Sequence, residues 1–144
     1  MKKFLIILGF ILSNLYAFDN ITTIKVYNKI ITSIFPKKET INIYVLNKKY
    51  IDLFEISTKI HVVSDIKKAS IALVTNENEL YKIRKLNKKI MIFATKEKLI
   101  FVDELIIGAF YWKKGRSQLL FIKDRLNKYH IKLPNEYDKF IIEL

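Results

Sequence analysis

The sequence contains no cysteine, only three glycines and two prolines, and only three arginines among its 26 basic residues. The absence of cysteine excludes disulfides, thiolate chemistry and a lipid anchor on a cysteine. No glycine-rich phosphate loop, no nucleophile-elbow pattern and no zinc-ligand spacing occurs. Because each of the common reaction classes lacks a required group, we predict that the chain is not an enzyme and needs no cofactor or metal.

Long apolar runs are also missing. The run from Phe4 to Leu12 is far shorter than the roughly 20 residues that span a bilayer. It follows Lys2 and Lys3 and leads to a small residue, Ala17, which is typical of a signal peptide. We therefore predict a signal peptide over residues 1–17, cleaved near Ala17, and a single domain over residues 18–144 that is periplasmic and soluble. An uncleaved anchor is the alternative.

The charge is strongly positive, with a formal net charge of +12 that falls to +10 if residues 1–17 are removed. Nearly all of the cations are lysines, whereas nucleic-acid sites favour arginine because its planar fork pairs with guanine and phosphate. We therefore predict no nucleic-acid partner. Two interpretations of the charge stay open, a solvated lysine surface and an anionic surface of the envelope as partner.

The first part of the predicted domain alternates helices and strands. Apolar residues at helical spacing predict a helix from Ile21 to Phe35, and Asn76 with Glu79 forms a capping-box pattern at the start of another. Asn47 to Phe54 is ambiguous between helix and irregular structure. Short β-branched runs predict strands at Ile41 to Leu46, Ile60 to Ser64, Ser70 to Thr75 and Ile90 to Ala94. This alternation is typical of a parallel sheet.

From Leu99 onward the pattern changes, because three apolar runs follow one another without helical segments between them. We predict antiparallel strands at residues 99–102, 105–112 and 117–122, with Gly115 in a tight turn, and terminal helices at 123–129 and 135–143. The predicted fold class is α/β: a single small domain with a mixed sheet, parallel core strands, a C-terminal antiparallel hairpin and helices on both faces.

The turn of this hairpin is the most distinctive stretch, since it mixes aromatic residues with cations. Such a mixture suits an anionic or aromatic partner. We predict partner contacts at Trp112, Lys113, Lys114 and Arg116, with Tyr111 as support. The alternative is a core hairpin whose basic tip is merely solvated.

A second candidate site lies where two predicted strands end. Ser64 and Asp65 follow one strand, and Thr75 and Asn76 follow the next. In open α/β sheets, ligands bind in the crevice at the carboxyl ends of parallel strands, and helix starts there favour anions. These four residues are therefore a possible ligand crevice.

The segment from Gly108 to Ile141 resembles the YfiR-like family of periplasmic proteins. Gly115 and Arg116 match the turn of the family's hairpin, Leu119 to Ile122 its following strand, and the predicted helices its C-terminal part. The strand, helix and strand over residues 70–94 are similar to the centre of the family fold. The resemblance implies a non-enzymatic periplasmic protein that binds and modulates a membrane-bound signalling protein, either a diguanylate cyclase or a sensor kinase, through the periplasmic domain of that partner.

Two alternatives to this function remain open. The first is a periplasmic protein that binds a small molecule in the crevice, and the second is an electrostatic binder of anionic envelope components. The resemblance supplies no contact residue and no cysteine-based control, so the partner and the oligomeric state are left unassigned.

Overall fold

The computed structural model describes residues 20–144, and the predicted signal peptide lies outside this range. The chain begins there with a helix over residues 20–34, called the N-terminal helix below. The strands are β1 (Ile41–Val45), β2 (Ile60–Val62), β3 (Ile71–Val74), β4 (Ile92–Ala94), β5 (Ile106–Lys113), β6 (Arg116–Ile122) and β7 (Ile141–Ile142). The later α-helices are α2 (Lys48–Phe54), α3 (Glu77–Leu86) and α4 (Lys123–Lys128), and the 3₁₀ helices are η1 (Ile66–Lys68), η2 (Glu97–Phe101) and η3 (Asn135–Phe140).

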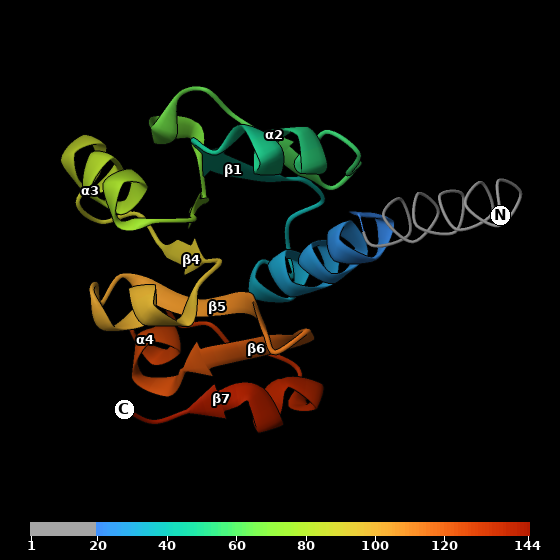
Figure 1. Ribbon diagram of the computed structural model, residues 1–144, viewed down its shortest axis with the longest axis vertical. Coiled ribbons are helices and arrows are strands. Elements are labelled where there is room, and N and C mark those ends of the chain that lie inside the picture. Colours follow the sequence, from blue (N-terminus) through green and yellow to red (C-terminus); the bar gives the residue numbers. More distant parts are fainter. Residues whose placement is uncertain (1–19) are drawn as a thin grey trace, which may run out of the picture.

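Within the described residues, the strands form one seven-stranded mixed sheet in the order β2-β1-β3-β4-β5-β6-β7. Strands β1 to β5 are parallel, β6 is antiparallel to β5, and β7 is parallel to β6. In Figure 1 the strands descend from β1 to β7, with the N-terminal helix (blue) on one side and α3 on the other. The predicted fold class, including the parallel core and the C-terminal hairpin, is confirmed.

Both faces of the sheet are buried because helices cover each of them. In β3, Ile71 and Leu73 pack under the N-terminal helix, whereas Ala72 and Val74 pack under α3. We call these two apolar clusters the N-helix core and the α3 core. A continuous apolar strand with no polar face is what a doubly covered parallel sheet requires.

Tyr27 is the centre of the N-helix core. Its ring meets the rings of Phe54 and Phe110 edge-on, each at 5.4 Å between centroids, and it is 1% exposed. The helical spacing of Ile24, Tyr27 and Ile31 aims this face at the sheet, as the sequence pattern predicts. The N-terminal helix thereby joins α2 to the middle of β5.

Strand β5 contains an irregularity that determines which face of the sheet each of its later side chains points to. Its register against β4 shifts by one residue, so that Ile106 pairs with Ile92 but Gly108 pairs with Phe93. Gly108 faces the N-helix core, where a Cβ would lie 2.5 Å from the carbonyl oxygen of Leu120. Only glycine allows so close an approach of two backbones.

Two predictions of secondary structure are wrong. The run at residues 99–102 belongs to η2 and the turn after it, because Leu99 and Ile100 cover the α3 core rather than extend the sheet. The segment at 135–143 is the 3₁₀ helix η3 followed by β7, since Ile141 pairs with Phe121 of β6. In consequence β5 is parallel to its neighbour β4, and β6 is the strand antiparallel to β5.

Candidate binding surface

The tip of the β5–β6 hairpin is a two-residue turn. Lys113 pairs with Arg116, and the residues between them both have positive φ, 51° for Lys114 and 76° for Gly115. Two left-handed residues define a type I′ turn, which continues the twist of the strands. The prediction of a tight turn at Gly115 is confirmed.

The cations at the tip are exposed to solvent. Lys113 lies 3.7 Å from the carboxylate of Glu97, as Nζ to Oε2. Lys114 and Arg116 form no ion pair and no side-chain hydrogen bond with any residue that the structure describes. Their charges are therefore free to meet an anionic partner.

The two aromatic residues next to the tip point to opposite faces of the sheet, as strand alternation predicts. Trp112 is 56% exposed and sits beside Phe110, with 6.4 Å between ring centroids. Tyr111 is partly buried against the α3 core. Burial and the neighbouring carboxylate of Glu97 raise the pKa of Tyr111. Trp112 is thus the aromatic residue of this pair with most of its surface open to a partner.

A groove of about 480 Å³ opens beside Trp112, between the hairpin, α2 and the start of the N-terminal helix. Its lining mixes aromatic, aliphatic and charged side chains: Asn20, Thr23, Lys49, Tyr50, Asp52, Leu53, Ile56 and Trp112. Burial raises the pKa of Tyr50, and its hydrogen bonds to Tyr27 and Thr95 offset part of that rise. The structure therefore joins the predicted hairpin site to α2, which the sequence did not connect with it.

The four residues of the predicted ligand crevice lie in two pairs at the carboxyl edge of the sheet, one pair after β2 and one after β3. Strand β1 lies between β2 and β3, so Ser64 and Asp65 are separated from Thr75 and Asn76. The Asp65 carboxylate accepts a hydrogen bond from the amide of Lys67 and so caps η1. Asn76 caps α3 in the same way, through the amide of Glu79. These polar groups already hold the local fold together.

Thr75 is held from two sides at the point where strand order reverses between β1 and β3. Its amide and hydroxyl both donate to the buried carboxylate of Glu79, at 2.9 and 2.8 Å. Asn47, at the end of β1, donates to the Thr75 hydroxyl at 3.3 Å. The place where α/β sheets often bind a ligand is filled here by side chains of the protein itself.

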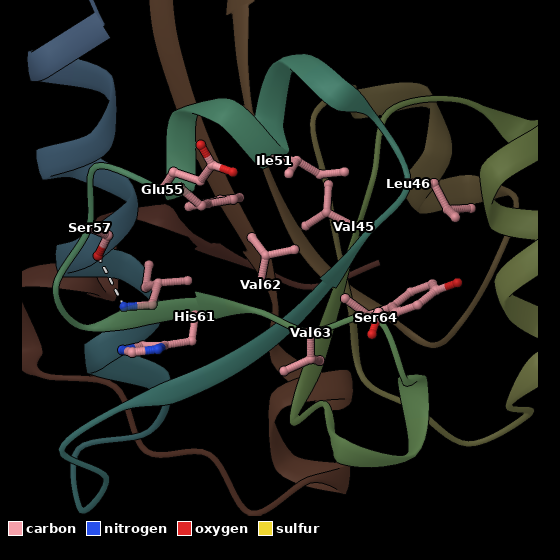
Figure 2. Close-up of a pocket in the computed structure, with 12 residues that line it drawn as sticks. Val45, Leu46, Ile51, Glu55, Ser57, His61, Val62, Val63 and Ser64 are labelled. Atoms are coloured by element: carbon pink, nitrogen blue, oxygen red, sulfur yellow. Dashed lines mark hydrogen bonds between the residues drawn. The ribbon is translucent and has the colours of Figure 1, made fainter.

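Ser64 instead borders an open hollow of about 750 Å³ beside the edge strand β2. Figure 2 shows Val62 pointing from β2 toward Ile51 of α2, whereas His61 points away from α2. Ser57 lies at the far end, where its hydroxyl accepts a hydrogen bond from the amide of Ile60. The lining is apolar near α2 and polar at its ends.

Two kinds of feature are absent from residues 20–144. No group of three or more His, Cys, Asp and Glu residues is placed there to hold a metal ion. No helix within that range is long and apolar enough to cross a membrane.

The sequence reasoning missed the groove partners on α2 and the side chains exposed at the end of η2. The sequence left Asn47 to Phe54 ambiguous, whereas the structure forms α2 there with Asn47 as its cap, and nothing in the spacing placed Asp52 or Ile56 beside Trp112. Phe101 was assigned to a strand and is 68% exposed. The one available indication in the sequence was Phe101 itself, a large aromatic residue within the apolar run 99–102.

Comparison with known proteins gives one informative likeness. No family model matches the sequence, and no curated protein matches it. The fold is similar to a crystal structure of a conserved domain protein from Vibrio cholerae O1 biovar El Tor str. N16961, with a TM-score of 0.59 and 12% identity. The match covers 83% of this chain and 59% of that one, so this chain spans less than two thirds of its length. At this identity the likeness concerns the fold.

Proposed function

We propose that this chain is a non-enzymatic periplasmic binding protein of the YfiR-like kind. Its partner is the periplasmic domain of an inner-membrane signalling protein, a diguanylate cyclase or a sensor kinase. The hairpin tip and the groove beside Trp112 make the contact. Binding changes the activity of the partner because the tip has different affinities for its two states.

One observation carries this proposal: the hairpin tip exposes Trp112 on one face of the sheet and Arg116 on the other, with Lys114 in the turn between them, and neither cation has a partner within the described chain. Tryptophan and arginine are the residue types that most often dominate binding energy at protein interfaces. The type I′ turn fixes the tip before binding, so little conformational entropy is lost when the complex forms. A rigid tip with unpaired charge fits a docking element better than a solvated turn.

The test is crosslinking in producing cells, followed by capture of the protein and mass spectrometry of the partners. The variant is Lys114→Glu with Arg116→Glu, which reverses both free charges. The matched control is Lys25→Glu with Lys132→Glu, two exposed lysines away from the hairpin that give the same change in net charge. We expect the hairpin variant to lose an inner-membrane signalling protein that the wild type and the control both retain.

Thermal unfolding of the same variants separates loss of binding from loss of fold, because exposed turn cations contribute little to stability. Unchanged unfolding temperatures together with loss of the partner support the proposal. Equal recovery of the partner by wild type and hairpin variant would remove the tip from the interface. Recovery of no membrane signalling protein by the wild type would overturn the proposed function.

A second candidate, binding of a small molecule, rests on the hollow beside β2, which places His61, Glu55 and Ser64 around apolar walls. A thermal-shift screen with periplasmic metabolites tests it, since a ligand that binds the folded state raises the unfolding temperature. Loss of that rise in a Val62→Asp variant would locate the site in the hollow.

A further inference from the structure

Several large apolar side chains are exposed to solvent on the α3 side of the sheet. Phe101 is 68% exposed, Val102 53% and Tyr81 64%. Tyr81 and Val102 line the same shallow hollow, so residues of α3 and of the turn after η2 belong to one patch. Contiguous exposed apolar residues rimmed by polar ones mark an interaction surface. We call Tyr81, Lys85, Lys98, Phe101 and Val102 the α3–η2 face.

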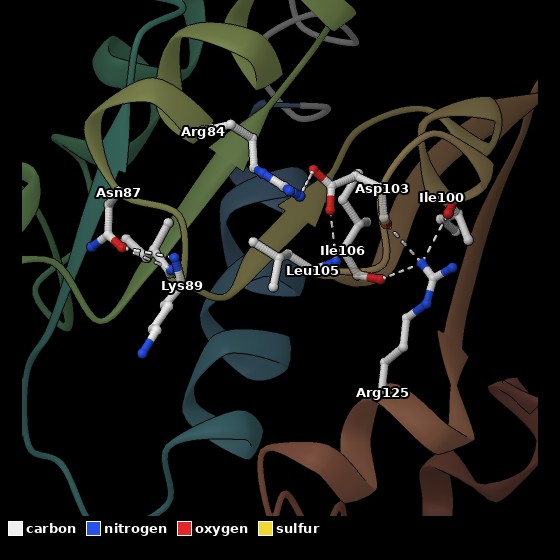
Figure 3. Close-up of polar contacts among 9 residues, drawn as sticks. Arg84, Asn87, Lys89, Ile100, Asp103, Leu105, Ile106 and Arg125 are labelled. Atoms are coloured by element: carbon white, nitrogen blue, oxygen red, sulfur yellow. Dashed lines mark hydrogen bonds and ion pairs between the residues drawn. The ribbon is translucent and has the colours of Figure 1, made fainter.

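The turn that carries Phe101 and Val102 is braced from below. Nη1 of Arg125 donates to the carbonyl oxygens of Ile100, Asp103 and Ile106, at 2.8, 3.0 and 2.8 Å. Figure 3 shows this nitrogen between the carbonyls that flank the exposed pair. Phe101 and Val102 lie in the chain between the two bonded carbonyl groups, those of Ile100 and Asp103. Arg125 therefore fixes the backbone of the turn while the side chains of Phe101 and Val102 remain exposed to solvent.

The carboxylate of Asp103 strengthens the same brace. It forms an ion pair with Arg84 of α3 and accepts a hydrogen bond from the amide of Leu105 at 2.8 Å. Asp103 is 8% exposed, so this contact ties α3 to the turn beneath the surface. Burial lowers the pKa of the Arg125 guanidinium, and Asp103 offsets part of that effect. The two elements therefore present their exposed side chains as one rigid face.

Lysines share α3 and η2 with the two aromatic rings of this face, and one of them, Lys85, lies over its ring. Nζ of Lys85 lies 4.4 Å from the ring centroid of Tyr81, one turn earlier on α3. In η2, Lys98 and Phe101 are three residues apart, and side chains at that spacing eclipse each other on a 3₁₀ helix. An aromatic ring with an ammonium group above it matches the boundary between acyl chains and headgroups, where lysine stems lie along apolar surface and their charges reach outward.

The charge around the α3–η2 face indicates which kind of partner it binds. Exposed lysines on and next to α3 and η2 outnumber the carboxylates that reach solvent: Lys82, Lys85, Lys88, Lys89, Lys96 and Lys98 against Glu77, Glu104 and the Glu97 side chain, which is 40% exposed. We propose that the α3–η2 face docks on the surface of an anionic phospholipid bilayer, with Phe101 and Val102 in the interface and the lysines against the headgroups. This assignment includes none of the hairpin residues and does not depend on the proposed partner.

The absence of cysteine allows a site-specific test on the full chain. A Val102→Cys variant labelled with an environment-sensitive fluorophore is mixed with vesicles of phosphatidylglycerol and phosphatidylcholine, or of phosphatidylcholine alone. We expect a blue shift of the emission with the anionic vesicles and none with the neutral ones. The matched control is Ser117→Cys on the hairpin, also exposed, which we expect to report no shift. Because the readout is local, binding through any other part of the chain does not imitate it.

Charge variants decide whether the face or the net charge is responsible. Lys85→Glu with Lys98→Glu should weaken vesicle binding by at least about 25-fold, because each lysine near an anionic surface contributes a factor of about five and the new carboxylates are repelled. Lys25→Glu with Lys132→Glu should change it less than about twofold. No shift at position 102, equal shifts at positions 102 and 117, or equal weakening by both charge variants would overturn the proposal. Loss of the shift with vesicles but binding of a protein in its place would assign the face to a protein partner instead.

Discussion

Two places at the same edge of the sheet, the carboxyl ends of its parallel strands, use their polar residues in opposite ways. At the carboxyl ends of β1 and β3, Asn47, Thr75 and Glu79 are bonded to one another, and Glu79 is 8% exposed. At the tip of the hairpin, Lys114 and Arg116 are exposed and meet no partner within the described residues. Both places were candidate sites in the sequence, because a list of residue types does not tell whether their hydrogen bonds are already made.

This difference separates groups that stabilise the fold from groups that remain available to another molecule. A buried carboxylate whose lone pairs are satisfied inside the protein is costly to remove and has little left to offer a ligand. An exposed guanidinium contributes little to folding and can be changed with small effect. Paired substitutions of the same residue type, one at a group bonded inside the protein and one at an exposed group, therefore test the assignment directly.

The largest expected effect is at Glu79. Replacement of Glu79 by Ala leaves the amide and hydroxyl of Thr75 without their acceptor, and we expect the free energy of unfolding to fall by about 3 kcal/mol. Urea unfolding measures this loss. The control is Glu77→Ala, an exposed carboxylate in the same helical turn, which should cost about 0.5 kcal/mol through the helix dipole. Similar small losses in both variants would mean that the buried contact is not stabilising.

Two arginines give the next contrast. Arg125→Met should lower the free energy of unfolding by about 2 kcal/mol, because three carbonyl groups lose a charged donor. Arg116→Met should change it by less than about 0.5 kcal/mol, as expected for an exposed residue without partners. Unfolding by urea, followed by circular dichroism, compares the two. A large loss at Arg116 would show that the hairpin tip is structural.

Tyrosine titration sharpens the contrast further. Burial, reinforced by Tyr50, raises the pKa of Tyr27 well above its ordinary value of 10.0. The unfolded chain then releases this proton at lower pH than the folded chain, so the free energy of unfolding falls as the pH rises above 10. We expect Tyr27→Phe to cost about 1 kcal/mol at neutral pH and to lose stability less steeply above pH 10. Parallel curves for the variant and the wild type would contradict this, and Tyr111→Phe serves as the more exposed control.

The smallest effect is expected at the turn itself. Asn followed by Gly is the preferred pair of a type I′ turn, so Lys114→Asn should raise the free energy of unfolding by about 0.5 kcal/mol. The same variant should weaken capture of the membrane partner, because one free charge of the tip is gone. Lys113→Asn lies outside the left-handed pair and should bring no gain in stability. A gain in stability with full retention of partner binding would remove Lys114 from the interface.

Local patterns predicted most of the fold. Asn76 and Glu79 marked the start of α3, although the Glu79 carboxylate bonds to Thr75 rather than to the amide of Asn76 as in an ideal capping box. The continuous apolar run of β3 indicated a doubly covered parallel strand. Both inferences depend on neighbours within a few residues, where sequence spacing and spatial distance agree.

The wrong predictions and the omissions share one cause, which is that they depend on contacts between distant segments. Leu99 and Ile100 are residue types common in strands, but they lie in a 3₁₀ helix because their side chains pack into the α3 core. Ile141 pairs with β6 because η3 returns the chain to the sheet edge. The groove beside Trp112 likewise requires α2 and the hairpin to meet, and no local pattern encodes that meeting.

The type I′ hairpin also bears on the order in which the molecule acquires its structure. Strands β5 and β6 pair through a turn of two residues, so their loop closes on the microsecond timescale, whereas each parallel pair must first bring together segments separated by a helical connection. Strand β5 is also the neighbour of β4, and it therefore offers a ready edge on which β4, β3, β1 and β2 can assemble in turn. Refolding should then begin near the carboxyl end, against the direction in which the ribosome delivers the chain.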